Sequence, residues 1–212
     1  MRLAVALIAT LAVLGCAPRL KPLPGTPVTM PLPTTELASG HRRIVFRWEL
    51  TDADIVARGE GAARIASPDS ARLDFFLGGG VGGGAAILIG NELILHDEAN
   101  DMSRRLVPPA PLLWATLGRL AIGGLDKVTT VSNGATLQAD VGDPIVWRVT
   151  FLRDTLTRLE HVERDRVLEW VERSVDGRSV RYRHETQRRA LELTITSNTS
   201  VGAFDPAIWS FR

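Results

Sequence analysis

Residues 43–50 read Arg-Ile-Val-Phe-Arg-Trp-Glu-Leu, with a large apolar side chain at every second position. The apolar positions are Ile44, Phe46, Trp48 and Leu50, and the charged residues Arg43, Arg47 and Glu49 occupy alternate positions, on the other side of the strand. Successive side chains of a strand point to opposite faces of its sheet. The alternation therefore predicts a β-strand with one apolar face and one polar face.

The same period of two recurs along the chain, in residues 71–77, 137–141, 145–151, 180–184 and 191–195. Residues typical of turns separate these stretches: Ser67-Pro68-Asp69, the glycine run 78–84, Gly90-Asn91, Asn133-Gly134, Gly142-Asp143-Pro144 and Asp176-Gly177. Residues 156–174 also fit a helical spacing, and we interpret them as two strands. About ten strands at this spacing predict an antiparallel meander, sandwich or barrel.

One segment differs from this pattern. Prolines at 108, 109 and 111 precede the apolar residues 112–122, and Gly123-Gly124 follows them, so we expect a helix that is apolar nearly all round. Such a helix has to be buried, and in a β protein it can cover the mouth or concave face of a curved sheet. Curved sheets with an internal helix often enclose a hydrophobic cavity. The alternative is that the helix completes a solid core.

The first residues have the features of an export signal. Arg2 precedes an apolar run of residues 3–14, which is too short for a helix that crosses about 30 Å of hydrocarbon. The run ends in Val13-Leu14-Gly15-Cys16-Ala17, which resembles the bacterial lipobox, and Cys16 is the only cysteine of the chain. We expect residues 1–15 to be a signal peptide and Cys16 to carry the lipid anchor. An ordinary signal peptide with a chance cysteine is the alternative.

Residues 17–40 hold six of the twelve prolines. Proline removes a backbone donor and fixes φ, so we expect a mobile, extended tether that starts at Cys16 and leads to a single domain in residues 41–212. At about 3.1 Å per residue, this tether could hold the domain up to about 70 Å from the bilayer. Ala17, by resemblance to proteobacterial lipoproteins, favours the outer membrane.

Composition excludes several classes of function. Lys and Arg number 25 against 24 for Asp and Glu, so charge offers no reason to expect a nucleic acid as partner. One cysteine and four histidines leave little material for a zinc site, and no common nucleophile or zinc motif occurs. The nine arginines and seven acids of residues 158–189 suggest a solvated outer face with cross-strand pairs. We expect no catalytic residue, no metal and no cofactor, and an envelope hydrolase is the least favoured function.

Several motifs in succession resemble one family. They are residues 58–65 (Arg-Gly-Glu-Gly-Ala-Ala-Arg-Ile), Ser67-Pro68-Asp69, residues 71–74, the glycine loop, residues 91–95, the proline-led helix and, near the end, residues 204–209. In order and spacing they resemble the LolA/LolB superfamily of lipoprotein carriers and receptors, over about residues 40–197. The resemblance implies an unclosed antiparallel β half-barrel, whose helices cover a hydrophobic cavity that accepts acyl chains of lipoproteins in transit. The lipobox makes the membrane-anchored receptor branch the closer analogy.

The resemblance also indicates site residues. We expect the cavity to be lined by apolar side chains of the strands and the helix: Phe46, Trp48, Leu73, Phe75, Leu113, Trp114, Leu117 and Trp147. The glycine run 78–84 lacks the Lys-Ser/Thr pair of a phosphate loop and presents one side chain, Val81. In the receptor branch the matching loop has a leucine at its tip, so Val81 is the candidate membrane-transfer residue. The alternative is a flexible hairpin whose valine folds back on the sheet.

These patterns together predict a mainly β outer-membrane lipoprotein that binds an acyl or lipid-like ligand. Its partners would be a periplasmic carrier that delivers acylated lipoproteins and the membrane that receives them. The alternative from another class is a non-enzymatic envelope scaffold that recruits a protein partner and has a filled core. A cavity large enough for an acyl chain discriminates between the two.

Overall fold

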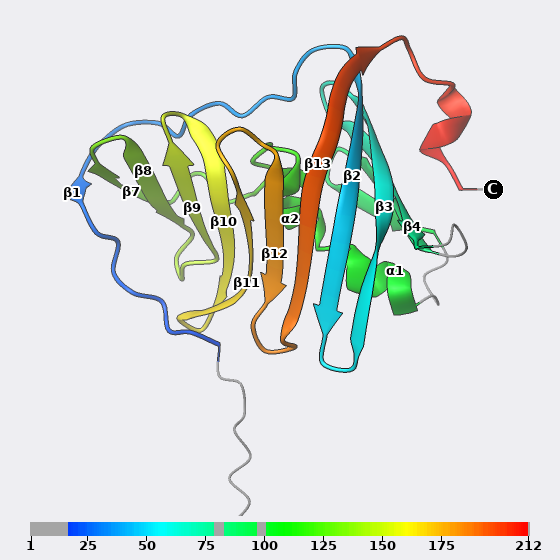
Figure 1. The fold of residues 1–212 in the computed structure, drawn as a ribbon. Helices are drawn as coiled ribbons and strands as arrows, with labels where there is room; N and C mark the ends of the chain where they lie inside the picture. The colour runs from blue at the N-terminus through cyan, green and yellow to red at the C-terminus, as the bar shows by residue number, and fades with distance from the viewer. Residues whose placement is uncertain (1–16, 79–82, 97–100, 212) are drawn as a thin grey trace, which may run out of the picture.

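A computed structural model describes residues 17–78, 83–96 and 101–211 of the chain. They form one antiparallel sheet of 13 strands, in the order β1-β7-β8-β9-β10-β11-β12-β13-β2-β3-β4-β5-β6, with two short helices on its concave side (Figure 1). The strands are β1 Thr26–Pro27, β2 His41–Asp52, β3 Ile55–Ala66, β4 Ser70–Leu77, β5 Gly83–Ile89, β6 Glu92–Leu95, β7 Val128–Asn133, β8 Thr136–Val141, β9 Trp147–Leu152, β10 Thr155–Glu163, β11 Arg166–Arg173, β12 Ser179–His184 and β13 Arg189–Val201. The helices are α1 Asp101–Leu106, α2 Ala110–Thr116 and the 3₁₀ turn η1 Pro206–Trp209. Since β1 and β6 are the two edge strands and do not pair with each other, the sheet is unclosed, and the predicted mainly β fold class is confirmed.

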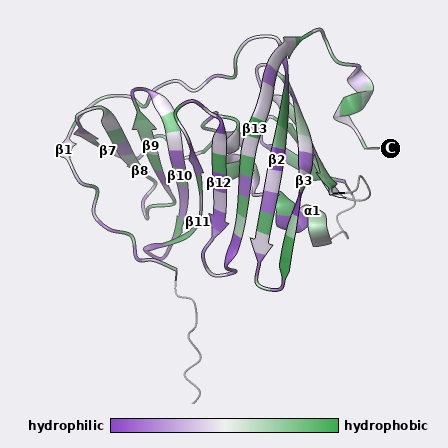
Figure 2. Ribbon diagram, viewed as in Figure 1, coloured by the Kyte–Doolittle hydropathy of each residue, from purple (hydrophilic) through white to green (hydrophobic). Residues whose placement is uncertain are grey.

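The alternation in β2 determines which face of the sheet is buried. Phe46, Trp48 and Leu50 are each no more than 2% exposed, whereas Arg47 and Glu49 point to solvent. Along β2 in Figure 2, hydrophilic and hydrophobic residues alternate in the same way. On β13, the last strand of the chain, the register sets apolar residues beside those of β2, which joins the two halves of the sheet.

Residues 156–174 form two strands, as predicted. They are β10 and β11, joined by a turn in which Arg164 and Asp165 have φ of 49° and 58°. Positive φ is unusual for residues other than glycine, and it supplies the tight reversal that the strands need.

The helix that was expected over residues 112–122 ends early, at Thr116. Gly118 has φ +88°, which is incompatible with a continuing helix, and the Arg119 amide donates back to the Trp114 carbonyl at 3.0 Å. The stop signal is therefore Gly118 rather than Gly123-Gly124. The sequence patterns also missed α1, which packs near β5.

Residues 17–37, here called the N-terminal strap, are extended as expected but lie against the domain. A tether free of the domain was expected for this segment. The strap runs along the β1 edge and then over the top of the sheet (Figure 1). Near its start, Arg166 Nη1 donates to the Ala17 carbonyl at 3.0 Å, and Arg148 Nη1 donates to the Lys21 carbonyl at 2.7 Å. Proline removes amide donors but leaves carbonyl acceptors, so a proline-rich segment can dock wherever the domain offers donors.

The later part of the strap is bound as firmly. β1 pairs with β7, the Leu120 amide donates to Thr35 Oγ1 at 2.7 Å, and the side chain of Leu37 is buried. The strap thus completes one edge of the sheet and one wall of its concave side.

The two ends of the sheet differ. The β10–β11 turn, which binds Ala17, lies at the same end as the β12–β13 and β2–β3 turns and the β4–β5 connection that contains the glycine loop. We call this the anchor end. The β3–β4 and β11–β12 turns lie at the opposite end. Among the described residues, no helix is long and apolar enough to cross a bilayer.

Candidate functional site

The concave face of the sheet encloses a cavity of about 340 Å³, toward the end opposite the anchor end. Its apolar wall comes from inward positions of five strands: Ile44, Phe46, Ala63, Ile65, Leu73, Val180, Leu193 and Ile195. Leu37 of the strap and Leu117 after α2 close the other side. Exposed Glu36 and Asn198 lie at the rim, where Arg42 Nε donates to Asn198 Oδ1 at 2.9 Å. An apolar interior with a few polar groups at the mouth is typical of a site for a small, mostly apolar ligand.

Two local features leave this space open. Ala63 of β3 lies between Ile44 of β2 and Leu73 of β4, so a small side chain interrupts a row of large ones. The early end of α2 at Gly118 also leaves this part of the sheet without a helix above it. A helix that continued to residue 122 would cover more of the same face.

The structure brings three of the eight predicted lining residues to the cavity: Phe46, Leu73 and Leu117. The other five lie elsewhere. Trp48, Phe75, Leu113 and Trp114 belong to the solid core beside the cavity, and Trp147 stacks on His161 at 4.8 Å between ring centroids. The apolar lining residues that were not singled out are aliphatic, among them Ile44, Leu193 and Ile195, whose inward direction the alternation had already indicated.

Two glycines of the 58–65 motif allow the aromatic core to form. A side chain at Gly61 would collide with the Phe46 ring, and a side chain at Gly59 would collide with Trp48 and with the backbone of β4. The Phe46 ring, which gains this space, packs edge-on against Phe75 at 5.4 Å between centroids. The motif therefore has a packing role in the wall that borders the cavity.

A polar network lies on the concave face nearer the anchor end. Tyr182 donates its hydroxyl to Glu169 at 2.8 Å, and His161 Nδ1 lies 3.1 Å from the same carboxylate. Burial, followed by the charge of Glu169, raises the pKa of Tyr182 far above its usual range. Within residues 17–78, 83–96 and 101–211, no three His, Cys, Asp or Glu side chains gather in a way that could hold a metal ion.

This network predicts that the protein loses stability in acid. Burial tends to raise the pKa of Glu169, but hydrogen bonds from His161 and Tyr182 outweigh burial, so the pKa of Glu169 is lowered. Burial lowers the pKa of His184, although the nearby Glu169 carboxylate opposes this shift. Both groups bind protons less readily in the folded state, so unfolding takes up protons. The free energy of unfolding should fall as the pH drops below 6.5, the ordinary value for histidine, and fall further below 4.5, that for glutamate.

Urea unfolding at a series of pH values measures this dependence. Glu169→Gln keeps an acceptor for Tyr182 and removes the titrating carboxylate, so the decline below pH 4.5 should be shallower in this variant. A free energy of unfolding that rises on acidification would contradict the assignment.

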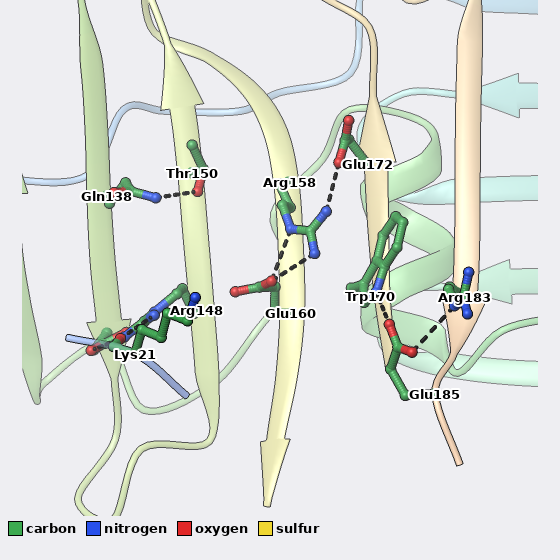
Figure 3. A network of polar contacts seen from close by, with 11 residues as sticks. Lys21, Gln138, Arg148, Thr150, Arg158, Glu160, Trp170, Glu172, Arg183 and Glu185 are labelled. Carbon is green, nitrogen blue, oxygen red and sulfur yellow. Dashed lines mark hydrogen bonds and ion pairs between the residues drawn. The ribbon is translucent and has the colours of Figure 1, made fainter. Parts of the chain in front are cut away.

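The convex face carries most of the charged residues of 158–189. Arg158 bridges Glu160 and Glu172 across β10 and β11, with N–O distances of 2.8 and 2.6 Å (Figure 3). Three members of this stretch instead point to the concave side: Glu169 and Arg173, next to buried Val171, and Arg189, whose Nε donates to buried Asp52 at 3.0 Å. The interpretation of a uniformly outer, solvated face is wrong at these three positions.

Two predicted functional residues, Cys16 and Val81, lie outside the described residues. The bases of the glycine loop are described: the Gly78 amide donates to the Arg58 carbonyl at 3.1 Å, and a side chain at Gly83 would collide with the Phe75 backbone. Gly83 is thus required by a close backbone approach as well as by its place in the loop.

No protein-family model and no curated protein matches this sequence. Among solved structures, the chain is similar to a LolA superfamily protein from Nitrosomonas europaea, with a TM-score of 0.51 and 10% identity over 84% of this chain and 93% of that one. The chain has a LolA-like fold. It is also similar to a putative outer membrane lipoprotein-sorting protein domain from Vibrio parahaemolyticus, with a TM-score of 0.50 and 11% identity over 80% of this chain and 89% of that one.

A DUF1329 family protein from Desulfovibrio piger is similar to the same degree, with a TM-score of 0.50 and 11% identity over 82% of this chain and 90% of that one. At these identities the likeness concerns the fold alone. The LolA-like fold places an unclosed sheet around the helices and the cavity, and the function has to be argued from the cavity itself.

Proposed function

We propose that this protein is an outer-membrane lipoprotein that binds an acyl or lipid-like ligand without catalysing a reaction. Its ligand would be an acylated lipoprotein, received from a periplasmic carrier and passed to the membrane. The observation that carries the proposal is the apolar cavity of about 340 Å³. A scaffold that only recruits a protein partner would be expected to have a filled core.

The proposed transfer depends on apolar burial alone. An acyl chain leaves one apolar environment for another, and each Å² kept from water contributes about 25 cal/mol. The direction of transfer follows from the difference in burial between the carrier, this cavity and the bilayer. No proton or covalent step is needed, so the proposal assigns no catalytic residue. Val81 remains the candidate for contact with the membrane.

The N-terminal strap gives the proposed anchor a definite geometry. If Cys16 is lipidated, the next residue, Ala17, is already bound to Arg166 beside the β10–β11 turn. The anchor end, with the glycine loop, would then face the bilayer at close range instead of about 70 Å away. The cavity, near the opposite end, would open toward the aqueous periplasm, from which a carrier would approach.

Native mass spectrometry of the mature chain with Cys16→Ser tests ligand binding. This chain contains every element that the structure describes and carries no lipid of its own. Offered a diacylated cysteine peptide or lysophosphatidylcholine, it should form a one-to-one complex. Ile195→Trp, which fills the cavity, should abolish that complex, because the acyl chain of the ligand and the indole ring cannot occupy the same volume.

Ile89→Trp makes the same substitution on β5, at a partly exposed position outside the cavity lining, and should leave binding intact. Thermal unfolding of both variants checks that they fold. The proposed function would be refuted if the Cys16→Ser chain formed no lipid complex, or if the chain with Ile195→Trp bound the lipid equally well.

A further inference from the structure

One cation in the wall of the cavity makes no hydrogen bond to any other residue that the structure describes. Arg173, the last residue of β11, is partly buried and lines the cavity beside Leu117 and Val180. Its Nε is buried without a hydrogen-bond partner, and none of the hydrogen bonds or ion pairs among the described residues involves its guanidinium. Nearby Asp176 acts on Arg173 through its charge, but its Oδ1 accepts from Ser174 Oγ at 2.6 Å and from the Arg178 amide at 3.0 Å, and no hydrogen bond joins it to the Arg173 Nε.

Two glycines hold space around this guanidinium. A side chain at Gly177 would collide with it, and one at Gly118 would lie only 3.2 Å from Arg173 Nη1. Both glycines have positive φ, +68° and +88°, so the turns that carry them also favour glycine. The guanidinium is thereby held in the cavity wall, where its Nε has no hydrogen-bond partner.

A charged group in this position is costly unless something binds it. Desolvation lowers the pKa of Arg173, opposed by the charge of Asp176, yet an arginine keeps its proton under ordinary conditions. Buried charges in proteins are normally paired. By contrast, Arg42 at the same rim is already bonded to Asn198. Arg119 Nη1 is also buried without a partner, but Arg119 lies over the Trp114 ring and does not line the cavity.

We propose that Arg173 binds the anionic head group, a carboxylate or a phosphate, of a single-chain amphiphile whose acyl chain fills the cavity. This inference rests on the proposed function, lipid binding in this cavity, and narrows its ligand from an acylated lipoprotein to a single-chain amphiphile. The planar guanidinium suits both anions because it can donate two parallel hydrogen bonds. At about 340 Å³, the cavity lies near the lower end of the roughly 300–1,000 Å³ range of small-molecule sites, which fits one chain better than three.

The test compares three ligands of one chain length: dodecanoate, dodecyl phosphate and uncharged dodecanol. Isothermal titration on the mature Cys16→Ser chain at pH 7.5 should show both anions binding more tightly than dodecanol. Arg173→Met keeps a chain of similar length and removes the guanidinium, so it should weaken anion binding about ten- to a hundredfold and leave dodecanol unchanged. Whichever anion binds more tightly identifies the source, a fatty acid or a phosphate ester.

The control is Arg178→Met, the same substitution on an exposed side chain of the neighbouring turn, which should change nothing. Equal binding of dodecanol and the anions to the unsubstituted chain would overturn the head-group role and leave the proposed function standing. An equal loss of all three ligands in Arg173→Met would assign Arg173 a purely structural role. Failure of all three to bind the unsubstituted chain would overturn this inference, and the native mass spectrometry with a diacylated peptide decides the proposed function separately.

Discussion

Trp114→Ala is expected to lower the free energy of unfolding by about 3–5 kcal/mol, the usual cost of removing a large aromatic side chain from a core. Trp114 of α2 is fully buried in the main hydrophobic cluster. Its Nε1 donates to the Gly90 carbonyl at 2.8 Å, and the Arg119 guanidinium lies 4.6 Å from its ring centroid. The substitution would leave a cavity in the core and the Gly90 carbonyl without its donor. Among the described residues, this is the one side-chain hydrogen bond between α2 and the β5–β6 turn, and it would be lost.

Urea unfolding followed by circular dichroism measures the effect, with Trp170→Ala as the matched control. Trp170 lies on the convex face, where Nε1 donates to Glu185 at 2.7 Å and Arg158 covers the ring at 4.1 Å (Figure 3). Its removal should cost less, about 1–3 kcal/mol, because no core cavity forms. A loss in Trp114→Ala no larger than in Trp170→Ala would show that α2 is not part of the core. Because Trp114 supports the fold, a variant at this position is a poor probe of ligand binding, and Ile195 is the better one.

The strands could be predicted because only one face of this sheet is buried. Burial on one side imposes a period of two on each strand, and that period can be recognised in short local stretches such as residues 43–50. The glycines and the Ser67-Pro68-Asp69 turn mark the ends of strands for equally local reasons. The fold class followed from these local signals, without knowledge of which strands are neighbours.

Turns that lack glycine and asparagine were harder to predict from the sequence. Arg153-Asp154 and Arg164-Asp165 reverse the chain with positive φ at all four residues, where the sequence carries neither glycine nor asparagine. Ambiguity over residues 156–174 came from this missing turn signal at Arg164-Asp165. Gly118 was equally hard to interpret, because a glycine inside an apolar run ends a helix in some contexts and is tolerated in others.

The candidate site was harder to predict than the fold because it is made by contacts between distant parts of the chain. Leu37 of the strap and Ile195 of β13 face the same space, and no local pattern relates them. The preference for aromatic lining residues selected Trp48 and Phe75, which pack against each other at 6.2 Å between centroids and fill the core. Arg173 was grouped with outer-face charges because the surrounding sequence is highly charged, although its position in β11 alternates with exposed Glu172.

In membranes, a cysteine at the anchor end is expected to be protected from a bulky water-soluble maleimide, and one at the opposite end to react freely. Glu163→Cys and Arg178→Cys suit this comparison because both positions are exposed and lie at opposite ends of the sheet. The only natural cysteine, Cys16, would be blocked by its lipid. The expected difference follows from the strap: Ala17 is bonded to Arg166, three residues from position 163, so the bilayer would cover that turn.

The matched reference replaces residues 1–15 with a conventionally cleaved signal peptide and Cys16 with Ser. This form should leave the membrane fraction almost entirely, because each buried methylene of the missing acyl chains contributes about 0.8 kcal/mol to membrane binding. Its two introduced cysteines should then react at similar rates. Membrane retention of the reference form would refute the anchor at Cys16. Equal reactivity of the two positions in the membrane-bound protein would instead keep the anchor and refute the fixed orientation, since it would mean that the strap detaches from Arg166 and Arg148 at the bilayer and acts as a free tether.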